Sequence, residues 1–125
     1  MNRLRRRTLP LILVGLAAWR GAALAAPAEA EARKIEDLIR YIESRQDIRF
    51  VRNGSAYTAA QAGRFLRGKL RAMGDDVSTA RQFIDQIASK SSTSGKPYTV
   101  TDADGHSLPS AQFLGDELAR IERKP

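Results

Sequence analysis

The fold class is determined by residues 48–73, which read IRFVRNGSAYTAAQAGRFLRGKLRAM. The first ten of these residues alternate apolar and polar side chains around Asn53-Gly54, a dipeptide that favours the positive φ angles of a tight hairpin turn. Thr58 and Gln61 then form the pattern of a capping box, which starts a helix. This stretch therefore predicts a β-hairpin that leads directly into a helix ending at about residue 73.

The helix predicted for residues 58–73 has two distinct sides. Its inner face is expected to carry Ala59, Ala62, Leu66, Leu70 and Met73. Another side carries three cations, Arg64, Arg67 and Arg71. The simplest interpretation of these cations is a solvated face that pairs with nearby acidic residues, namely Asp75, Asp76 or Asp85.

The segments on either side of this stretch predict further elements. Upstream, residues 28–45 form a helix whose apolar side chains recur at helical spacing: Ile35, Leu38, Ile39 and Ile42. Downstream, Thr79 and Gln82 form a second capping box before a helix with the apolar face Ala80, Phe83, Ile84, Ile87 and Ala88. A short strand at 98–100, a turn at 102–105 and a last helix from Pro109 follow. The pattern predicts an α+β fold, a mainly helical single domain of about four helices with one or two small β-hairpins.

The first 25 residues are typical of an export signal. A basic start is followed by an apolar stretch at residues 9–19, which is too short for a stable membrane span, and by the small-x-small site Ala23-Leu24-Ala25. We expect residues 1–25 to be a cleaved signal peptide, and residues 26–125 to be a single small periplasmic domain with its core at about 33–122. An uncleaved anchor and the twin-arginine route are the alternatives, and no membrane association is expected after cleavage.

The charge of the chain depends on this processing. The whole chain has a formal net charge of +7. Five of its 21 basic residues lie within residues 1–25 and all 14 acidic residues follow them, which leaves a net charge of +2. Such a balance argues against a nucleic-acid partner. The chain has no cysteine, which excludes a disulfide framework, a thiol nucleophile and a thiolate metal site.

Four segments between residues 48 and 100 occur in a distinctive order and spacing. They are Phe50-Val-Arg-Asn-Gly54, Leu66-Arg67-x-Lys69-Leu70, Thr79-Ala-x-Gln-Phe-Ile-Asp85 and Ala88-Ser-x-Ser-Ser-x-Ser-Gly-Lys-Pro-Tyr98. Together they resemble the YfeK-like family of small exported bacterial proteins, a domain of unknown function. The resemblance implies a periplasmic location and a mainly helical single domain, and it implies no activity and no cofactor.

The serine-rich loop at residues 91–96 is the most unusual segment. Its Gly95-Lys96 pair is similar to part of a phosphate loop, but the other residues of that motif are missing. A Ser–Lys hydrolase would use Ser91, Ser92 or Ser94 as the nucleophile and Lys90 or Lys96 as the base. The Ser-x-x-Lys spacing of penicillin-binding proteins is absent, and serines after a helix are more often turn formers.

Two further patterns do not support a metal site. Asp102-x-Asp104-Gly105 is similar to the middle of a calcium loop, but Val100 and Ala111 occupy the first and last ligand positions, so we expect a turn. His106 is the only histidine, which excludes a catalytic triad and a multi-histidine metal site. We therefore assign no catalytic residue, no metal ligand and no cofactor.

One set of polar and cationic residues is the best candidate for a binding site. It joins the hairpin turn, the second helix and the serine-rich loop: Arg52, Asn53, Arg67, Lys69, Ser94, Gly95 and Lys96. Guanidinium groups and free loop amides suit carboxylate and phosphate groups. If the helix packs beside the hairpin, Arg52 and Arg67 can approach each other and the Lys96 loop, an arrangement best tolerated when an anion, or an internal acid such as Asp85, bridges the two charges.

These observations predict an exported periplasmic protein of unknown biochemical function. Its expected role is binding or interaction, with an anionic envelope ligand or an envelope protein as the partner. The alternative is a small cell-envelope hydrolase centred on the Ser91–Lys96 loop. A structural protein without a ligand is a third possibility.

Overall fold

The computed structural model describes residues 28–124, so the predicted signal peptide at residues 1–25 lies outside the described residues. In chain order the elements are α2 (Glu29–Ser44), β1 (Arg49–Arg52), β2 (Ser55–Tyr57), α3 (Ala59–Met73), α4 (Ala80–Gln82), the π-helical turn η1 (Phe83–Ile87), β3 (Thr99–Thr101), β4 (Ser107–Pro109) and α5 (Ser110–Arg123). The predicted α+β class is confirmed.

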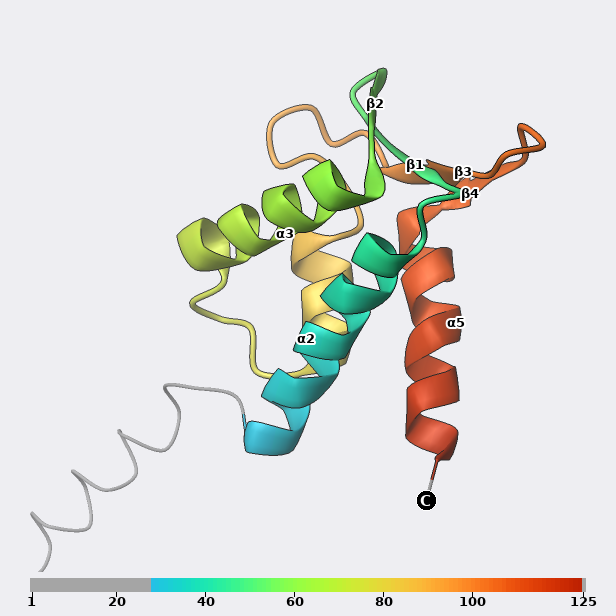
Figure 1. Ribbon diagram of the computed structural model, residues 1–125. Coiled ribbons are helices and arrows are strands. Elements are labelled where there is room, and N and C mark those ends of the chain that lie inside the picture. The colour runs from blue at the N-terminus through green and yellow to red at the C-terminus, as the bar shows by residue number, and fades with distance from the viewer. Residues whose placement is uncertain (1–27, 125) are drawn as a thin grey trace, which may run out of the picture.

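In the described part of the chain, the helices lie on one side of a small sheet (Figure 1).

The four strands form one antiparallel sheet in the order β2-β1-β3-β4. In the first hairpin Arg52 lies opposite Ser55, which leaves Asn53 and Gly54 as a two-residue turn with φ angles of 49° and 83°. Positive φ at both positions is what such a turn requires. The β1–β3 pairing joins the two hairpins into one sheet, and the local sequence pattern did not predict it.

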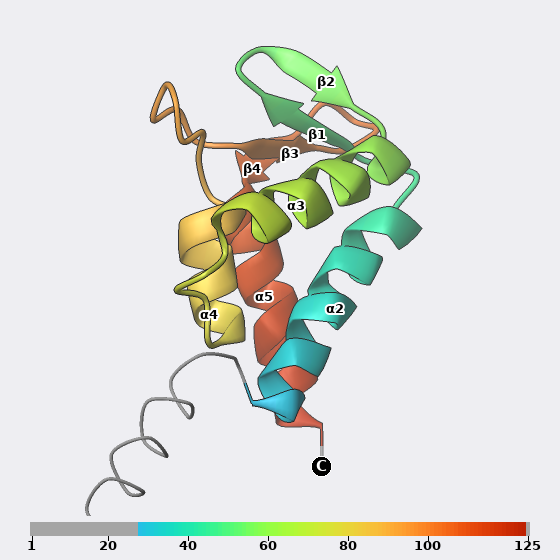
Figure 2. The same ribbon diagram turned by 90° about the vertical axis from the view of Figure 1, so that its left-hand side faces the viewer.

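One hydrophobic core lies between the sheet and the helices. Phe50 and Val100 pair across β1 and β3 and are both buried, and the ring of Tyr98 lies 5.2 Å from the ring of Phe50. The helix α2 packs between α3 and α5 and buries its whole predicted apolar stripe, Ile35, Leu38, Ile39 and Ile42. Figure 2 shows α4, α3 and α5 around this core from a second direction.

The helix α3 begins as predicted, but its inner face is different from the prediction. The Thr58 hydroxyl accepts a hydrogen bond from the Gln61 amide at 3.2 Å, and the Gln61 side chain accepts one from the Thr58 amide at 2.9 Å. The prediction that Met73 faces the core was wrong, because this residue lies in the last turn, lines a groove and is 52% exposed. Lys69 is buried instead.

The third helical segment is shorter and wider than expected. The capping box at Thr79 is present, but only one α-helical turn follows before the chain widens into η1. The Ala88 amide donates to the Phe83 carbonyl at 3.1 Å, five residues back, which is the bonding of a π-helix. All five residues of the predicted apolar face are nevertheless buried.

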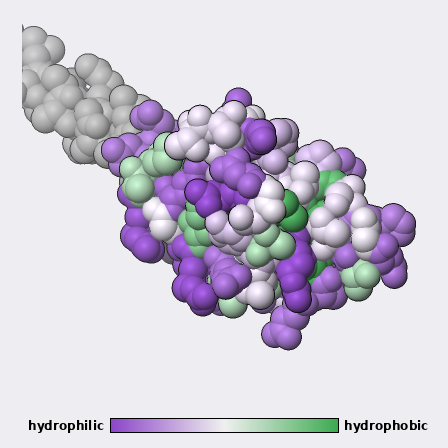
Figure 3. Space-filling view, turned by 90° about the horizontal axis from the view of Figure 1, so that it is seen from above, coloured by the Kyte–Doolittle hydropathy of each residue, from purple (hydrophilic) through white to green (hydrophobic). Residues whose placement is uncertain are grey.

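Two features of the outer surface complete the description. Viewed from above, the end of the molecule that carries the sheet is mainly hydrophilic, with small hydrophobic patches between polar residues (Figure 3). Between residues 28 and 124, no helix has the length and apolar character needed to cross a membrane.

Candidate functional site

The candidate site is a groove of about 390 Å³ beside α3, which we call the α3 groove. One wall comes from α3, and the other comes from the end of β1 and the serine-rich loop. Its lining residues include no acidic side chain: they are Arg52, Arg64, Phe65, Gly68, Lys69, Met73, Ser91, Ser92, Thr93 and Tyr98. The α3 members recur three or four residues apart, which places them along one side of the helix. The groove therefore combines cations with an apolar floor.

Arg52 forms the upper edge of the α3 groove. Its guanidinium carbon lies 4.6 Å from the centre of the Phe65 ring, a cation–π arrangement, and its Nη1 donates to the Tyr57 hydroxyl at 2.5 Å. Arg64 lies one residue before Phe65 on α3 and is exposed. Neither arginine forms an ion pair with a residue between 28 and 124.

Lys69 places a third cation in the same groove. This side chain is buried, and its Nζ donates to the Lys90 carbonyl at 2.8 Å and to the Tyr98 hydroxyl at 2.9 Å. The Nζ also lies 4.9 Å from the centre of the Tyr98 ring. All of these partners are neutral, and within residues 28–124 no carboxylate pairs with this amine. A buried cation with only neutral partners favours a bound anion nearby.

The serine-rich loop is held against the hairpin turn. The Ser91 hydroxyl oxygen accepts from the Asn53 side-chain amide at 3.3 Å, and the Ser94 hydroxyl donates to the Asn53 side-chain oxygen at 2.7 Å. The backbone amides of the predicted site residues in this loop are already used: Ser94 donates to the Ser91 hydroxyl, Gly95 to the Ser91 carbonyl and Lys96 to the Ser94 hydroxyl. The expectation that these loop amides are free for a ligand was therefore wrong.

The loop has no hydrolase-like geometry. Ser91 is buried and its hydroxyl oxygen accepts the amides of Thr93 and Ser94 at 3.3 and 3.2 Å, so it organises the loop. Among the hydrogen bonds of residues 28–124, none joins a lysine amine to the hydroxyl of Ser91, Ser92 or Ser94. No observation therefore favours the Ser–Lys alternative.

The structure brings together most of the predicted site residues but separates Arg67 from them. Arg52 and Lys69 line the α3 groove, while Asn53, Ser94, Gly95 and Lys96 lie in the turn and loop at its rim. Arg67 instead donates to Glu36 at 2.8 and 2.9 Å and to Glu43 at 3.3 and 3.1 Å, both on α2. The expected approach of Arg67 to the rest of the patch does not occur.

The acidic partners of Arg67 also differ from those expected. Within residues 28–124, Arg67 forms no ion pair with Asp75, Asp76 or Asp85. Hydrogen bonds from Arg67, supported by Arg40, lower the pKa of Glu36 to about 2 against the cost of partial burial. A second groove of about 380 Å³ lies here between α2 and α3. Its arginine, Arg67, already has two carboxylate partners, Glu36 and Glu43, so it does not need a bound anion.

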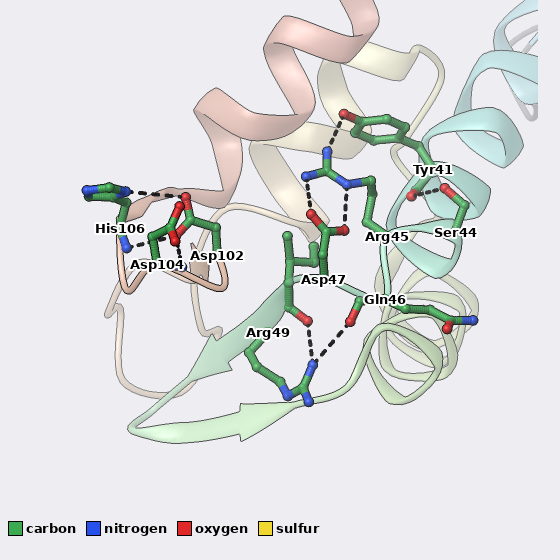
Figure 4. Close-up of polar contacts among 10 residues, drawn as sticks. Tyr41, Ser44, Arg45, Gln46, Asp47, Arg49, Asp102, Asp104 and His106 are labelled. Carbon is green, nitrogen blue, oxygen red and sulfur yellow. Dashed lines mark hydrogen bonds and ion pairs between the residues drawn. The ribbon is translucent and has the colours of Figure 1, made fainter.

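Two polar clusters elsewhere are explained by structural roles (Figure 4). Asp102, Asp104 and His106 offer ligand atoms within 4.8 Å of one another. The Asp102 carboxylate, however, accepts the backbone amides of Asp104 and His106 at 2.9 Å each, which makes the predicted turn. In the second cluster, Arg45 donates to Asp47 and to the Tyr41 hydroxyl, and thereby ties the end of α2 to the following segment.

Several groove residues were missed in the sequence analysis. Arg64, Phe65, Gly68, Met73 and Tyr98 line the groove but were not assigned to the site. The spacing of Phe65, Lys69 and Met73, four residues apart, was the available signal, because such residues follow one line along a helix. This spacing was not assigned to a site because Met73 was expected to face the core.

The chain belongs to the family of unknown function DUF5329, whose model matches residues 29–122 and so covers nearly all of the described structure. A curated relative is the protein named "Uncharacterized protein YfeK" from Salmonella typhimurium, which is 40% identical over 87 residues. The match covers 70% of this chain and 68% of that protein. No solved structure matches the chain. The predicted resemblance to a YfeK-like family is thereby confirmed.

Proposed function

We propose that this protein is an exported periplasmic binding protein that takes an anionic group into the α3 groove. The observation that carries the proposal is the lining of the groove: three cations, Arg52, Arg64 and Lys69, and no acidic side chain. Elsewhere between residues 28 and 124, Arg33, Arg40 and Arg120 have carboxylate partners, while others such as Arg49 have none; the groove differs because its three cations lie together.

The energetics support an anion at this place. Three like charges around one groove repel one another, and the aromatic rings of Phe65 and Tyr98 lower the local polarity, which strengthens that repulsion. A bound carboxylate or phosphate would offset it and would accept hydrogen bonds from the guanidinium groups. An anion therefore binds better here than a neutral molecule of the same shape.

Matched ligands and variants of the purified protein test this proposal. Benzoate and its neutral counterpart benzyl alcohol are titrated while NMR shifts or calorimetric heats are followed. We expect benzoate to bind and benzyl alcohol to bind at least tenfold more weakly. Arg52→Gln and Arg64→Gln should each weaken benzoate binding about tenfold, which corresponds to about 1.4 kcal/mol.

The control is Arg123→Gln, an exposed residue on α5 that does not line the α3 groove. It removes the same charge from the protein but should leave benzoate binding unchanged. Equal losses in all three variants would show only a general charge effect. That result, or no binding of benzoate and of inorganic phosphate to the wild type, would refute the proposal.

Export is the other part of the proposal, and it has a separate test. The basic start, the apolar stretch and the Ala23-Leu24-Ala25 site support cleavage after Ala25. Trp19 is the only tryptophan in the chain, so the processed protein should show tyrosine-like emission and an intact mass that begins at Ala26. Tryptophan emission from protein purified out of the periplasm would contradict the cleavage.

A further inference from the structure

Gly68 lies inside α3 and lines the α3 groove, yet its neighbours do not require a glycine. A Cβ atom built at this position would have Arg71 Nη2 as its nearest atom, at 4.0 Å. Gly63 in the same helix is different, because a Cβ there would overlap the side chain of Glu43. Glycine inside a helix costs about 1 kcal/mol relative to alanine. Because Gly68 has no side chain, the middle of the groove stays open, at this cost in helix stability.

The two ends of the groove differ in chemistry. Arg52 and Arg64 lie at the end near the start of α3, next to Phe65. Met73 lies at the other end, two turns further along, and is the exposed large hydrophobic side chain of the described residues. Its sulfur accepts a hydrogen bond from the Ser92 hydroxyl at 3.6 Å. A cationic end, a middle where Gly68 leaves space beside the buried Lys69, and an apolar end thus follow one another along α3.

We propose that the α3 groove binds an elongated amphiphilic anion. Its charged head lies among Arg52, Arg64 and Lys69, and its apolar body crosses Gly68 to reach Met73. This inference rests on the proposed function and specifies the class of ligand. It gives a role to three features that anion binding alone leaves unused: the helical glycine, the exposed methionine and the apolar floor.

Carboxylates of increasing chain length test the inference, each used below the concentration at which it forms micelles. Butanoate, hexanoate and octanoate are titrated into the purified protein by calorimetry. The affinity should rise about two- to fourfold with each added methylene, because each CH₂ group leaves water for an apolar surface. Met73→Ser should weaken octanoate binding at least fivefold and butanoate binding by a clearly smaller factor, so the ratio of the two affinities falls.

Glycine variants give an independent measurement. Gly68→Leu fills the middle of the groove and should weaken octanoate binding at least tenfold, and by a clearly larger factor than butanoate binding. Gly68→Ala keeps the fold measurable if the larger side chain does not, and should raise the melting temperature while weakening octanoate binding. Gly115→Ala in α5, where the nearest atom to a Cβ is Arg81 Nη1 at 3.6 Å, controls for the helix effect and should not change binding.

The possible results separate the two proposals. If all three carboxylates bind equally well, or if Gly68→Leu binds octanoate like the wild type, the amphiphile inference is overturned while the anion proposal stands. If no carboxylate binds, the anion proposal fails as well. A rise in affinity with chain length that Gly68→Leu and Met73→Ser both abolish supports the inference.

Discussion

Replacing Arg67 with methionine tests what holds α2 against α3. In the wild type, the guanidinium makes four hydrogen bonds to two carboxylates of α2, those of Glu36 and Glu43. Methionine keeps an unbranched side chain but removes the guanidinium group, and with it the charge and the hydrogen-bond donors. The two carboxylates are then left without this partner, so we expect the free energy of unfolding to fall.

The magnitude follows from the titration of Glu36. Its pKa is lowered from 4.5 to about 2, first by the hydrogen bonds from Arg67 and then by those from Arg40. At about 1.4 kcal/mol per pKa unit, the full shift corresponds to about 3 kcal/mol. Part of it belongs to Arg40, and the side chains of Glu36 and Arg67 are 38% and 33% exposed, which weakens the pair through solvent screening. We therefore expect a loss of about 1–2 kcal/mol.

Thermal and urea unfolding followed by circular dichroism measure this loss. For a domain of this size, it lowers the melting temperature by roughly 4–16 °C. A double-mutant cycle with Glu36→Gln should give a coupling of about 1 kcal/mol. Benzoate binding should not change, because Arg67 lies outside the α3 groove. Near-zero coupling, or weaker binding with unchanged stability, would refute this account of Arg67.

Three further predictions concern the turn, the core and acid stability. Gly54→Ala should cost about 1–2 kcal/mol, because φ is 83° there; an unchanged urea midpoint would contradict this. Phe83→Ala should cost about 3–5 kcal/mol in equilibrium unfolding, because the ring is fully buried, and a loss below about 1 kcal/mol would speak against that burial. The folded-state pKa of Glu36 lies below its unfolded value, so its stabilising effect is complete above about pH 4.5 and is lost as the pH falls toward 2. The difference in unfolding free energy between wild type and Glu36→Gln should therefore shrink from pH 7 to pH 2, and a constant difference would exclude this linkage.

The elements that follow from local chemistry were predictable from the sequence. Thr58 and Thr79 both form the capping boxes that their spacing indicates, and Asn53-Gly54 forms the predicted two-residue turn. The β1–β3 pairing was not predictable in this way, because it depends on contacts between segments far apart in the chain. The widening of η1 is also a tertiary effect, since the apolar spacing of its sequence is equally compatible with an α-helix.

The candidate site was predictable only in part. Because Arg52 and Lys69 are cationic, both were predicted to belong to one binding site, and both line the α3 groove. Periodicity alone could not show that Arg67 faces α2, because the acidic partner of an arginine depends on how the helices pack. For the same reason, Met73 was assigned to the core although it lines the groove. Charge and spacing therefore indicate the kind of site, whereas packing decides which residues belong to it.

The position of β3 in the sheet has a consequence for the order of folding. Each hairpin can form from neighbouring residues, but Val51 of β1 pairs with Thr99 of β3, near the other end of the chain. Of the four strands described, β3 is therefore the last but one to be synthesised, although it pairs with the first. Until then Phe50 lacks its partner Val100, and both residues belong to the one hydrophobic core. The β1–β3 contact joins residues far apart in the chain, and such long-range pairing closes slowly compared with the two local hairpins.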